Sequence, residues 1–538
     1  MVRMIRIMIR FAAVATILLS LSLPTLAQTP ARLYADVGQL RLRLDPGTLF
    51  DVPVTIHNAP DGAIPANIHV HLEATNGTIE SLVAPANWSC TNSTQSADCA
   101  VPALGSACRC SETAHLGLRL PAGSGGGATA LTATVSSELP QMDPAATTKA
   151  FQIYRRFPVT TTADAGPGSF RDAIESVNRS CGDEPCKIVF EIATPPTGGG
   201  WFTITPATPL PAITAKRVVV DGMRQTEISG ESNPRGPEIA IDGRLAGEGL
   251  VMLSPCESVL SGVAIGNFST NQGLWFSPSN DPALCHFDAL DRREVSRNSI
   301  GVDPIGEPWP NLRGLRLDGA TGSVHDNVIS RNTYSGIWRW AGNPLGLAIT
   351  NNFIDLNGAS GVLLAGPNAT ISSNVISGNA QMGVALAGES GEIRQNSMYD
   401  NGGLGIDRGL DGVDPLDETD RRVNPPTLLS ATYDAAGNKT VVTFTVHAQL
   451  SGIEANSFDF YANRGPDGDG EIPLGTHYPF ANPTRVEIPG DLRGMWIKAT
   501  TMRYTQVFAK PPARTATTDT VIGDNKMMSE LSAAVLVQ

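Results

Sequence analysis

The chain has 538 residues, of which 41% are hydrophobic and 17% are charged, and its formal net charge is −13. That length suits about three or four domains of ~150 residues each, and the hydrophobic content excludes a globally disordered chain. The acidic balance repels phosphate backbones and anionic lipid, which argues against nucleic acid as a partner.

The amino terminus has the pattern of a secretory signal peptide. Three arginines precede an uncharged apolar run over residues 11–23, and a small-x-small cleavage site follows just before Gln28. The run is shorter than the ~20 residues of a membrane-spanning helix. We therefore predict that residues 1–27 are removed. Removal of the three arginines takes the formal net charge from −13 to −16. We expect the mature chain to be exported to the cell envelope or extracellular space, without a transmembrane segment.

Residues 28–155 predict an antiparallel β-sandwich. Short runs such as DVPVTIHN (51–58) and NIHVHLEA (67–74) alternate apolar and polar residues. That alternation is typical of strands that bury one face.

Eight cysteines follow the signal segment, and an even number in an exported chain predicts disulfides. Two close pairs are the strongest candidates for bridges, and two further cysteines of the first domain are also expected to be bonded. The sequence leaves the connectivity open. The candidates are Cys181 with Cys186, Cys256 with Cys285, and Cys90 and Cys99.

A short amphipathic helix is expected at residues 168–178, GSFRDAIESVN. Ser169 and Asp172 have the spacing of a capping box. Three apolar residues, Phe170, Ile174 and Val177, fall on one face of such a helix. We predict that it covers the first coil of the repeat that follows it, because a solenoid needs its ends closed.

The middle of the chain repeats every 22 residues, with one interval of 25. Each unit holds two asparagines and a glycine between aliphatic stretches too short for a helix. This predicts a solenoid of stacked β coils ~4.8 Å apart, with asparagine amides bonded along the stack. We expect asparagine and glycine to supply the left-handed backbone of the corners. The residues are Gly314, Gly336, Gly361, Gly383 and Gly405, then Asn327, Asn352, Asn374 and Asn396, and Asn332, Asn357, Asn379 and Asn401.

Residues 423–538 predict a second, smaller β-sandwich. Its loop GPDGDGE contains Asp467, Asp469 and Glu471, which are oxygen ligands of the kind that Ca²⁺ takes. The full EF-hand spacing is missing, and a solvated acidic turn is the alternative. No motif requires a cofactor, and Ca²⁺ is the one ion that the sequence suggests.

Several stretches together carry a family resemblance. ADAGPGSFRDAIESVN (163–178), the asparagine-rich units and GGLGIDRGLDGVDPLDETD (402–420) resemble bacterial secreted right-handed parallel β-helix proteins of the pectate-lyase-like fold. NAPDGAIPANIHVHLEATNG (58–77) is similar to immunoglobulin-like modules of bacterial envelope proteins. The resemblance implies an all-β chain with an immunoglobulin-like sandwich at 28–155, a right-handed β-helix at 156–422 and a sandwich at 423–538.

Candidate binding residues lie at outward positions of the coils. The alternation places Trp338 and Trp340 outside on one face, where aromatic rings stack on the apolar faces of sugars. Coverage by neighbouring loops is the alternative. Asp355 and Tyr399 are outward on other coils and complete the predicted ligand-binding set. Arg339 falls where other coils carry leucine, which suggests a register break beside the three-residue insertion.

Two sets of residues are candidates for catalysis. Asp400 and Asp407 flank one corner and could serve as the paired carboxylates of a hydrolase. Arg394 and His325 could neutralise charge and remove a proton in a lyase. The Asn-Thr-Asp and Asp-Asp motifs of polygalacturonases and the Asp-His signature of pectin-cleaving lyases are absent.

The leading hypothesis is therefore a secreted or surface protein that binds extracellular polysaccharide, or another extended polymer, without a recognisable catalytic centre. One alternative is a polysaccharide lyase or glycoside hydrolase built on the same solenoid. Another is a structural or adhesive envelope protein.

Overall fold

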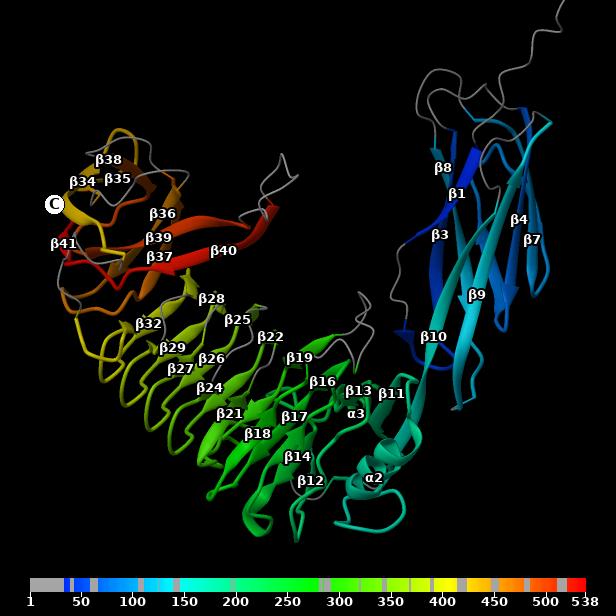
Figure 1. Cartoon of the computed structure of the whole chain (residues 1–538), viewed down its shortest axis with the longest axis horizontal. Helices are drawn as coiled ribbons and strands as arrows, with labels where there is room; N and C mark the ends of the chain where they lie inside the picture. The colour runs from blue at the N-terminus through cyan, green and yellow to red at the C-terminus, as the bar shows by residue number, and fades with distance from the viewer. Residues whose placement is uncertain are drawn as a thin grey trace, which may run out of the picture. The chain divides into compact units, whose positions relative to one another are not determined.

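The computed structural model describes residues 33–538 apart from 39–42, 59–65, 105–110, 124, 139–145, 194, 197–198, 280–283, 285–291, 319–320, 341–345, 367–368, 388–390, 414–422, 447–453, 479–483 and 510–519. The chain divides into two compact units, with the boundary in the sequence between Ile153 and Tyr154. Strands dominate both units (Figure 1). The predicted signal segment 1–27 lies outside the described residues.

The first unit is a β-sandwich. Its strands alternate as the sequence predicts: Val52, Val54 and Ile56 of one sheet and Val70 and Leu72 of the other are buried. A disulfide between Cys90 and Cys99 joins two neighbouring strands, so these cysteines bond as expected. One sheet consists of β1 (Leu33–Val37), β3 (Leu49–Asn58), β8 (Ser111–Arg119) and β5 (Thr78–Val83), and the other of β10 (Ala146–Val159), β9 (Gly125–Ser136), β4 (Ala66–Thr75), β7 (Ser96–Ala103), β6 (Ser89–Asn92) and the short β2 (Arg43–Leu44).

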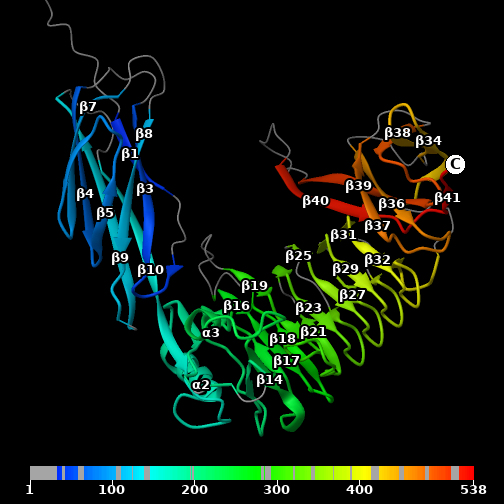
Figure 2. The ribbon, with the colours of Figure 1, turned by 180° about the vertical axis from the view of Figure 1, so that it is seen from behind.

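The second unit contains a parallel β-helix, whose coils lie side by side in both views (Figures 1 and 2). Each coil contributes one strand to each of three parallel sheets, which we call the first, second and third sheet.

The first sheet consists of β11 (Cys186–Phe190), β13 (Val218–Asp221), β16 (Ser258–Ser261), β19 (Arg293–Ser296), β22 (Gly322–His325), β25 (Leu347–Thr350), β28 (Ala369–Ser372) and β31 (Gly391–Arg394). The second sheet consists of β12 (Phe202–Ile204), β14 (Ile239–Asp242), β17 (Val263–Gly266), β20 (Ser299–Ile300), β23 (Val328–Ser330), β26 (Phe353–Asp355), β29 (Val375–Ser377) and β32 (Ser397–Tyr399). The third sheet consists of β15 (Leu250–Met252), β18 (Gln272–Phe276), β21 (Arg313–Leu317), β24 (Ile337–Trp340), β27 (Val362–Ala365), β30 (Val384–Leu386) and β33 (Ile406–Arg408).

Aliphatic columns fill the interior of the solenoid, as the repeat predicts. Val324, Ile349, Ile371 and Ile393 pair in successive strands of the first sheet and are buried. Equivalent columns line the other two sheets, and all of them belong to one continuous hydrophobic cluster. The alternate residues of each strand therefore point outward, where a partner can reach them.

Asparagine stacks run along two corners of the solenoid. In the corner between the first and second sheets, Asn352 Nδ2 donates to Asn374 Oδ1 at 2.9 Å, and the bond recurs from Asn298 to Asn396. In the corner between the second and third sheets, the same amide–amide hydrogen bond links successive asparagines from Asn311 to Asn401. The predicted structural role of the asparagines is confirmed, and each stack begins one coil earlier than the sequence periodicity indicated.

The corner chemistry differs from the prediction. The left-handed residue is the one that precedes each stacked asparagine except Asn311, such as Asn351 (φ 56°) or Ser373 (φ 59°). The repeated glycines are required for a different reason, which is close approach between coils. A Cβ on Gly336 would lie 2.8 Å from Asn357 Nδ2 and 2.9 Å from the backbone oxygen of Gly361.

A helix covers the first coil. Helix α2 (Phe170–Ser180) begins at Ser169, whose Oγ accepts from the Asp172 backbone N–H at 3.1 Å, and its apolar face joins the solenoid core. The disulfide Cys181–Cys186 connects its end to β11. The helix is thus confirmed. The short helices α3 (Met223–Ser229) and η1 (Gly243–Leu245) follow β13 and β14.

The carboxyl-terminal domain closes the other end. The loop before β37 continues the solenoid pattern, because Met398 N–H donates to the Gly470 carbonyl at 2.9 Å. The Asp469 carboxylate accepts hydrogen bonds from Asn401, in the place of a next asparagine in that stack. The domain packs a sheet of β34 (Thr427–Asp434), β35 (Lys439–Thr445) and β38 (Thr484–Pro489) on one of β37 (Ile472–His477), β36 (Glu454–Asn463), β39 (Trp496–Ala509), β40 (Thr520–Met528) and β41 (Val535–Leu536).

Candidate functional site

A row of large side chains lies on the outer face of the third sheet. The parallel register pairs Trp275 of β18 with Arg316 of β21, and Arg316 with Trp338 of β24. Leu363 of β27 continues the row. Because neighbouring coils are ~4.8 Å apart, the row runs across the strands and along the solenoid axis.

Guanidinium groups alternate with aromatic rings in this row. The Arg316 guanidinium lies 4.4 Å from the Trp275 ring centroid and 5.2 Å from that of Trp338. Its Nε also donates to Asp318 Oδ2 at 2.6 Å, so its orientation is fixed. Cation–π contacts of this kind contribute ~0.5–2 kcal/mol each. Arg316 therefore holds the two tryptophans in place.

Trp340 and Arg313 extend the row toward solvent. The Trp340 side chain is 62% exposed, and its ring centroid lies 6.1 Å from that of Trp338. The Arg313 guanidinium packs 4.7 Å above Trp338 and 5.5 Å from Tyr334. No described carboxylate forms an ion pair with Arg313, so its N–H groups are available to a ligand. We call Trp275, Arg313, Arg316, Trp338 and Trp340 the tryptophan–arginine face.

The predicted register break beside the insertion is wrong. Arg339 pairs with Leu317 in the coil before it and with Leu364 in the coil after it, and its side chain is fully buried in the solenoid. Burial lowers the pKa of its guanidinium. The continuous register is what keeps Trp338 and Trp340 outward together.

The other two predicted ligand-binding residues lie on a different face. Asp355 of β26 and Tyr399 of β32 are outward residues of the second sheet. Burial raises the pKa of Asp355, whose carboxylate also bonds Ser330. The four residues named from the sequence are thus divided between two sheets.

The carboxylates proposed for a hydrolase occupy different kinds of position. Asp400 is an exposed residue with left-handed backbone (φ 55°) at a corner. Asp407, in β33, is only 5% exposed, and burial raises its pKa while backbone N–H groups of Leu410 and Gly412 bond it. Each is therefore accounted for by local structure.

The residues proposed for a lyase lie on the first sheet. His325 Nδ1 lies 2.8 Å from Asp326 Oδ2, and its Nε2 lies 3.5 Å from Glu294 Oε1. On the coil before that of Glu294, the buried Glu257 accepts from the Tyr154 hydroxyl at 2.9 Å. Arg394, at the last coil, bonds Glu392 and Ser457 and thereby ties the solenoid to the carboxyl-terminal domain.

The acidic loop 465–471 packs against the last coil. Asp469 bonds Asn401, and Glu471 accepts from the Arg464 backbone N–H. Within the described ranges, no group of three His, Cys, Asp or Glu side chains is arranged to hold a metal ion. Calcium binding by Asp467, Asp469 and Glu471 remains a prediction.

Two of the three predicted disulfide sites are fully visible, Cys90–Cys99 and Cys181–Cys186. Cys256 is also disulfide-bonded, and its predicted partner Cys285 lies outside the described residues. In the part of the chain that the structure covers, no helix is long and apolar enough to cross a bilayer.

The sequence places Arg316 in the same outward column as Trp338, but sequence reasoning missed Trp275 and Arg313 as members of this face. A signal was present, because Gly273 precedes Trp275 by two residues, as Gly314 precedes Arg316 and Gly336 precedes Trp338. Because Gly273 and Gly314 are 41 residues apart, the 22-residue period does not connect Trp275 with the later coils.

Comparison with known proteins agrees with the fold. Residues 309–408 match the family model described as "Right handed beta helix region". Together with the three parallel sheets, this match defines an all-β chain with a right-handed parallel β-helix between two sandwich domains. No curated protein shows significant sequence similarity to the chain.

Solved structures with a likeness to the chain share little sequence. A cohesin module of a family 33 glycoside hydrolase from Clostridium perfringens is 15% identical over 23% of this chain and 97% of its own (TM-score 0.18). A non-cellulosomal cohesin from Archaeoglobus fulgidus is 14% identical over 23% and 91% (TM-score 0.17). The Dettilon tailspike protein is 12% identical over 64% and 94% (TM-score 0.16). These values carry no argument about activity.

Proposed function

We propose that the chain binds an extended polysaccharide along the tryptophan–arginine face. The observation that carries this proposal is the 62% exposed Trp340 ring beside the ordered row of Trp275, Arg316 and Trp338. A large aromatic ring left in water is unfavourable unless a partner covers it, and sugar rings offer the matching apolar face.

The geometry of the face suits a polymer better than a small ligand. Its members come from three consecutive coils, so the contacts repeat along the solenoid axis at ~4.8 Å steps. Arg313 supplies N–H donors for hydroxyl or carboxylate oxygens beside the rings. Arg316 is already bonded to Asp318, so it positions the rings and Arg313 is the ligand contact.

The disulfides support an oxidising compartment, which agrees with export to the envelope or extracellular space. Polysaccharides of cell walls and matrices are found there. The acidic composition disfavours a nucleic-acid partner.

A polysaccharide array that reports both binding and cleavage products tests the proposal. On any polysaccharide that binds, Trp340→Ala should weaken binding at least tenfold, which corresponds to ~1.4 kcal/mol. Tyr478→Ala is the matched control, because Tyr478 is 59% exposed in the carboxyl-terminal domain. Failure of every polysaccharide to bind, with no products, would favour a structural or adhesive role.

Cleavage of the polymer is a second candidate function, supported by the cluster around His325. An imidazole between Glu294 and Asp326 can accept a proton, and the neighbouring Arg292 lies 3.6 Å from Glu257 and from Glu294. Product release by the wild-type chain that is lost in His325→Ala would support it. Unchanged product release in that variant would exclude His325 as the base.

A further inference from the structure

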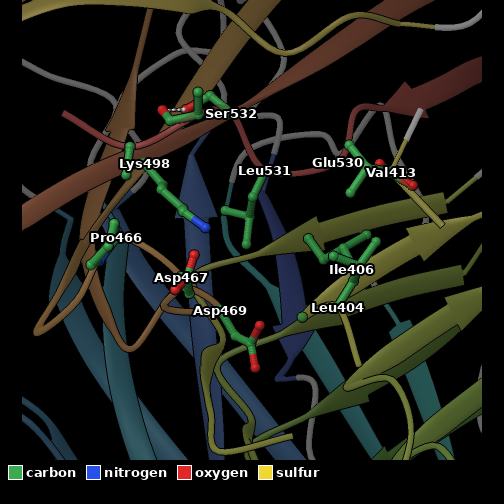
Figure 3. Close-up of a pocket in the computed structure, with 13 residues that line it drawn as sticks. Leu404, Ile406, Val413, Pro466, Asp467, Asp469, Lys498, Glu530, Leu531 and Ser532 are labelled. Atoms are coloured by element: carbon green, nitrogen blue, oxygen red, sulfur yellow. Dashed lines mark hydrogen bonds between the residues drawn. The ribbon is translucent and has the colours of Figure 1, made fainter. Parts of the chain in front are cut away.

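A cavity of about 410 Å³ lies between the last coil of the β-helix and the carboxyl-terminal domain. Figure 3 shows the segments that converge on it. The last coil provides Leu404, the loop between β36 and β37 provides Asp467 and Asp469, β39 provides Lys498, and the segment before β41 provides Leu531. Asp467, Asp469 and Lys498 thus lie on one side of the cavity, and apolar residues lie on the other side together with Glu530 (Figure 3).

Four charged side chains line the cavity. Glu530 is buried and accepts from the Arg408 backbone N–H at 3.1 Å, whereas Lys498, Asp467 and Asp469 keep free bonding capacity. The Lys498 amine points toward the loop that carries both aspartates (Figure 3), and no carboxylate within the described ranges forms an ion pair with it. Asp467 is exposed. Asp469 is committed in part, since Asn401 and the Gly405 backbone N–H bond its carboxylate.

The cavity withdraws Lys498 and Asp469 from water. Burial lowers the pKa of Lys498, and the nearby Asp469 and Asp467 oppose that shift only in part. Burial likewise raises the pKa of Asp469 to about 6. A charge that is partly desolvated and lacks a close counter-charge is unfavourable, and a ligand that supplies the counter-charge offsets that cost.

Charge complementarity narrows the ligand class. The Lys498 ammonium would repel a metal ion or a simple amine. The carboxylates of Asp467 and Asp469 would repel a simple anion. A neutral sugar would add no counter-charge to Lys498 or Asp469. A molecule with one ammonium and one carboxylate satisfies both signs at once, and the leucine-lined walls suit an aliphatic side chain.

We propose that this cavity binds a small aliphatic amino acid as its zwitterion. The ligand carboxylate pairs with the Lys498 ammonium, and the ligand ammonium pairs with Asp467 and Asp469. The side chain packs against Leu404 and Leu531. This site is separate from the tryptophan–arginine face, so its test does not depend on polysaccharide binding.

Isothermal titration calorimetry of the full mature chain at pH 7.5 tests the proposal with L-leucine as the probe. Two analogues are matched to it in shape: 4-methylpentanoate lacks the ammonium, and 3-methylbutylamine lacks the carboxylate. Leucine should bind saturably, and each analogue should bind at least tenfold more weakly. Absence of saturable leucine binding, or equal binding of either analogue, overturns the proposal.

Variants locate the binding. Lys498→Met and Asp467→Asn should each weaken leucine binding at least tenfold, whereas Lys149→Met, a lysine of the first unit, should leave it unchanged. Asp467 is exposed, so its variant tests the site even if Lys498→Met fails to fold. Unchanged leucine affinity in a folded Asp467→Asn or Lys498→Met chain refutes the assignment.

Discussion

Replacing one stacked asparagine by alanine should cost more stability than any surface change of the same size. Asn352 lies in the middle of its stack and is 2% exposed. Its Nδ2 donates to the Val324 and Thr350 carbonyls and to Asn374 Oδ1. Its Oδ1 accepts from the backbone N–H and the Nδ2 of Asn327.

Asn352→Ala removes all five of these hydrogen bonds and leaves the buried backbone N–H of Asn327 without its acceptor. A buried hydrogen bond contributes ~0.5–1.5 kcal/mol net, so the free energy of unfolding should fall by roughly 3–5 kcal/mol. Urea denaturation followed by circular dichroism measures the change.

Asn351→Gly is the matched control at the neighbouring position. Asn351 is exposed and has left-handed backbone (φ 56°), which glycine adopts freely. Its replacement should change the free energy of unfolding by less than ~1 kcal/mol. A loss below 1 kcal/mol for Asn352→Ala would refute the structural role of the stack.

Three further changes test other parts of the structure. The pKa of Asp469, about 6, lies above the usual 3.8, so its stabilising contribution is complete below pH ~4 and is lost as the pH rises through 6. Asp469→Asn should therefore stabilise the chain at pH 7.5 by ~1–3 kcal/mol but hardly at pH 4, as urea denaturation at both values would show. Arg339→Leu should lower the thermal midpoint, because the groups that interact with the buried guanidinium lose their partner; a higher midpoint contradicts this. Cys181→Ala with Cys186→Ala should lower the free energy of unfolding by ~2 kcal/mol, and equal urea midpoints would contradict it.

Periodicity made the solenoid predictable. A 22-residue interval with fixed aliphatic positions allows few folds, and the columns through Ile349 and Ile376 are buried as expected. The corners were less predictable, because left-handed backbone and side-chain stacking both favour asparagine. Periodicity identifies the residue that stacks, Asn352, but only coordinates show that the left-handed residue is its neighbour Asn351 (φ 56°).

The candidate site was predicted in part. Trp338 and Trp340 were found because alternation places them outward, but their partner Trp275 lies two coils away across a long interval. The cavity could not be predicted, because Lys498 and Leu404 are 94 positions apart in the sequence and meet only where the carboxyl-terminal domain closes the solenoid.

Affinity electrophoresis tests the central claim most directly, in gels that contain the polysaccharide selected by the array. The wild-type chain and Tyr478→Ala should be retarded equally, and Trp340→Ala should migrate as it does without polysaccharide. Equal retardation of Trp340→Ala and the wild type would contradict the assignment of binding to the tryptophan–arginine face.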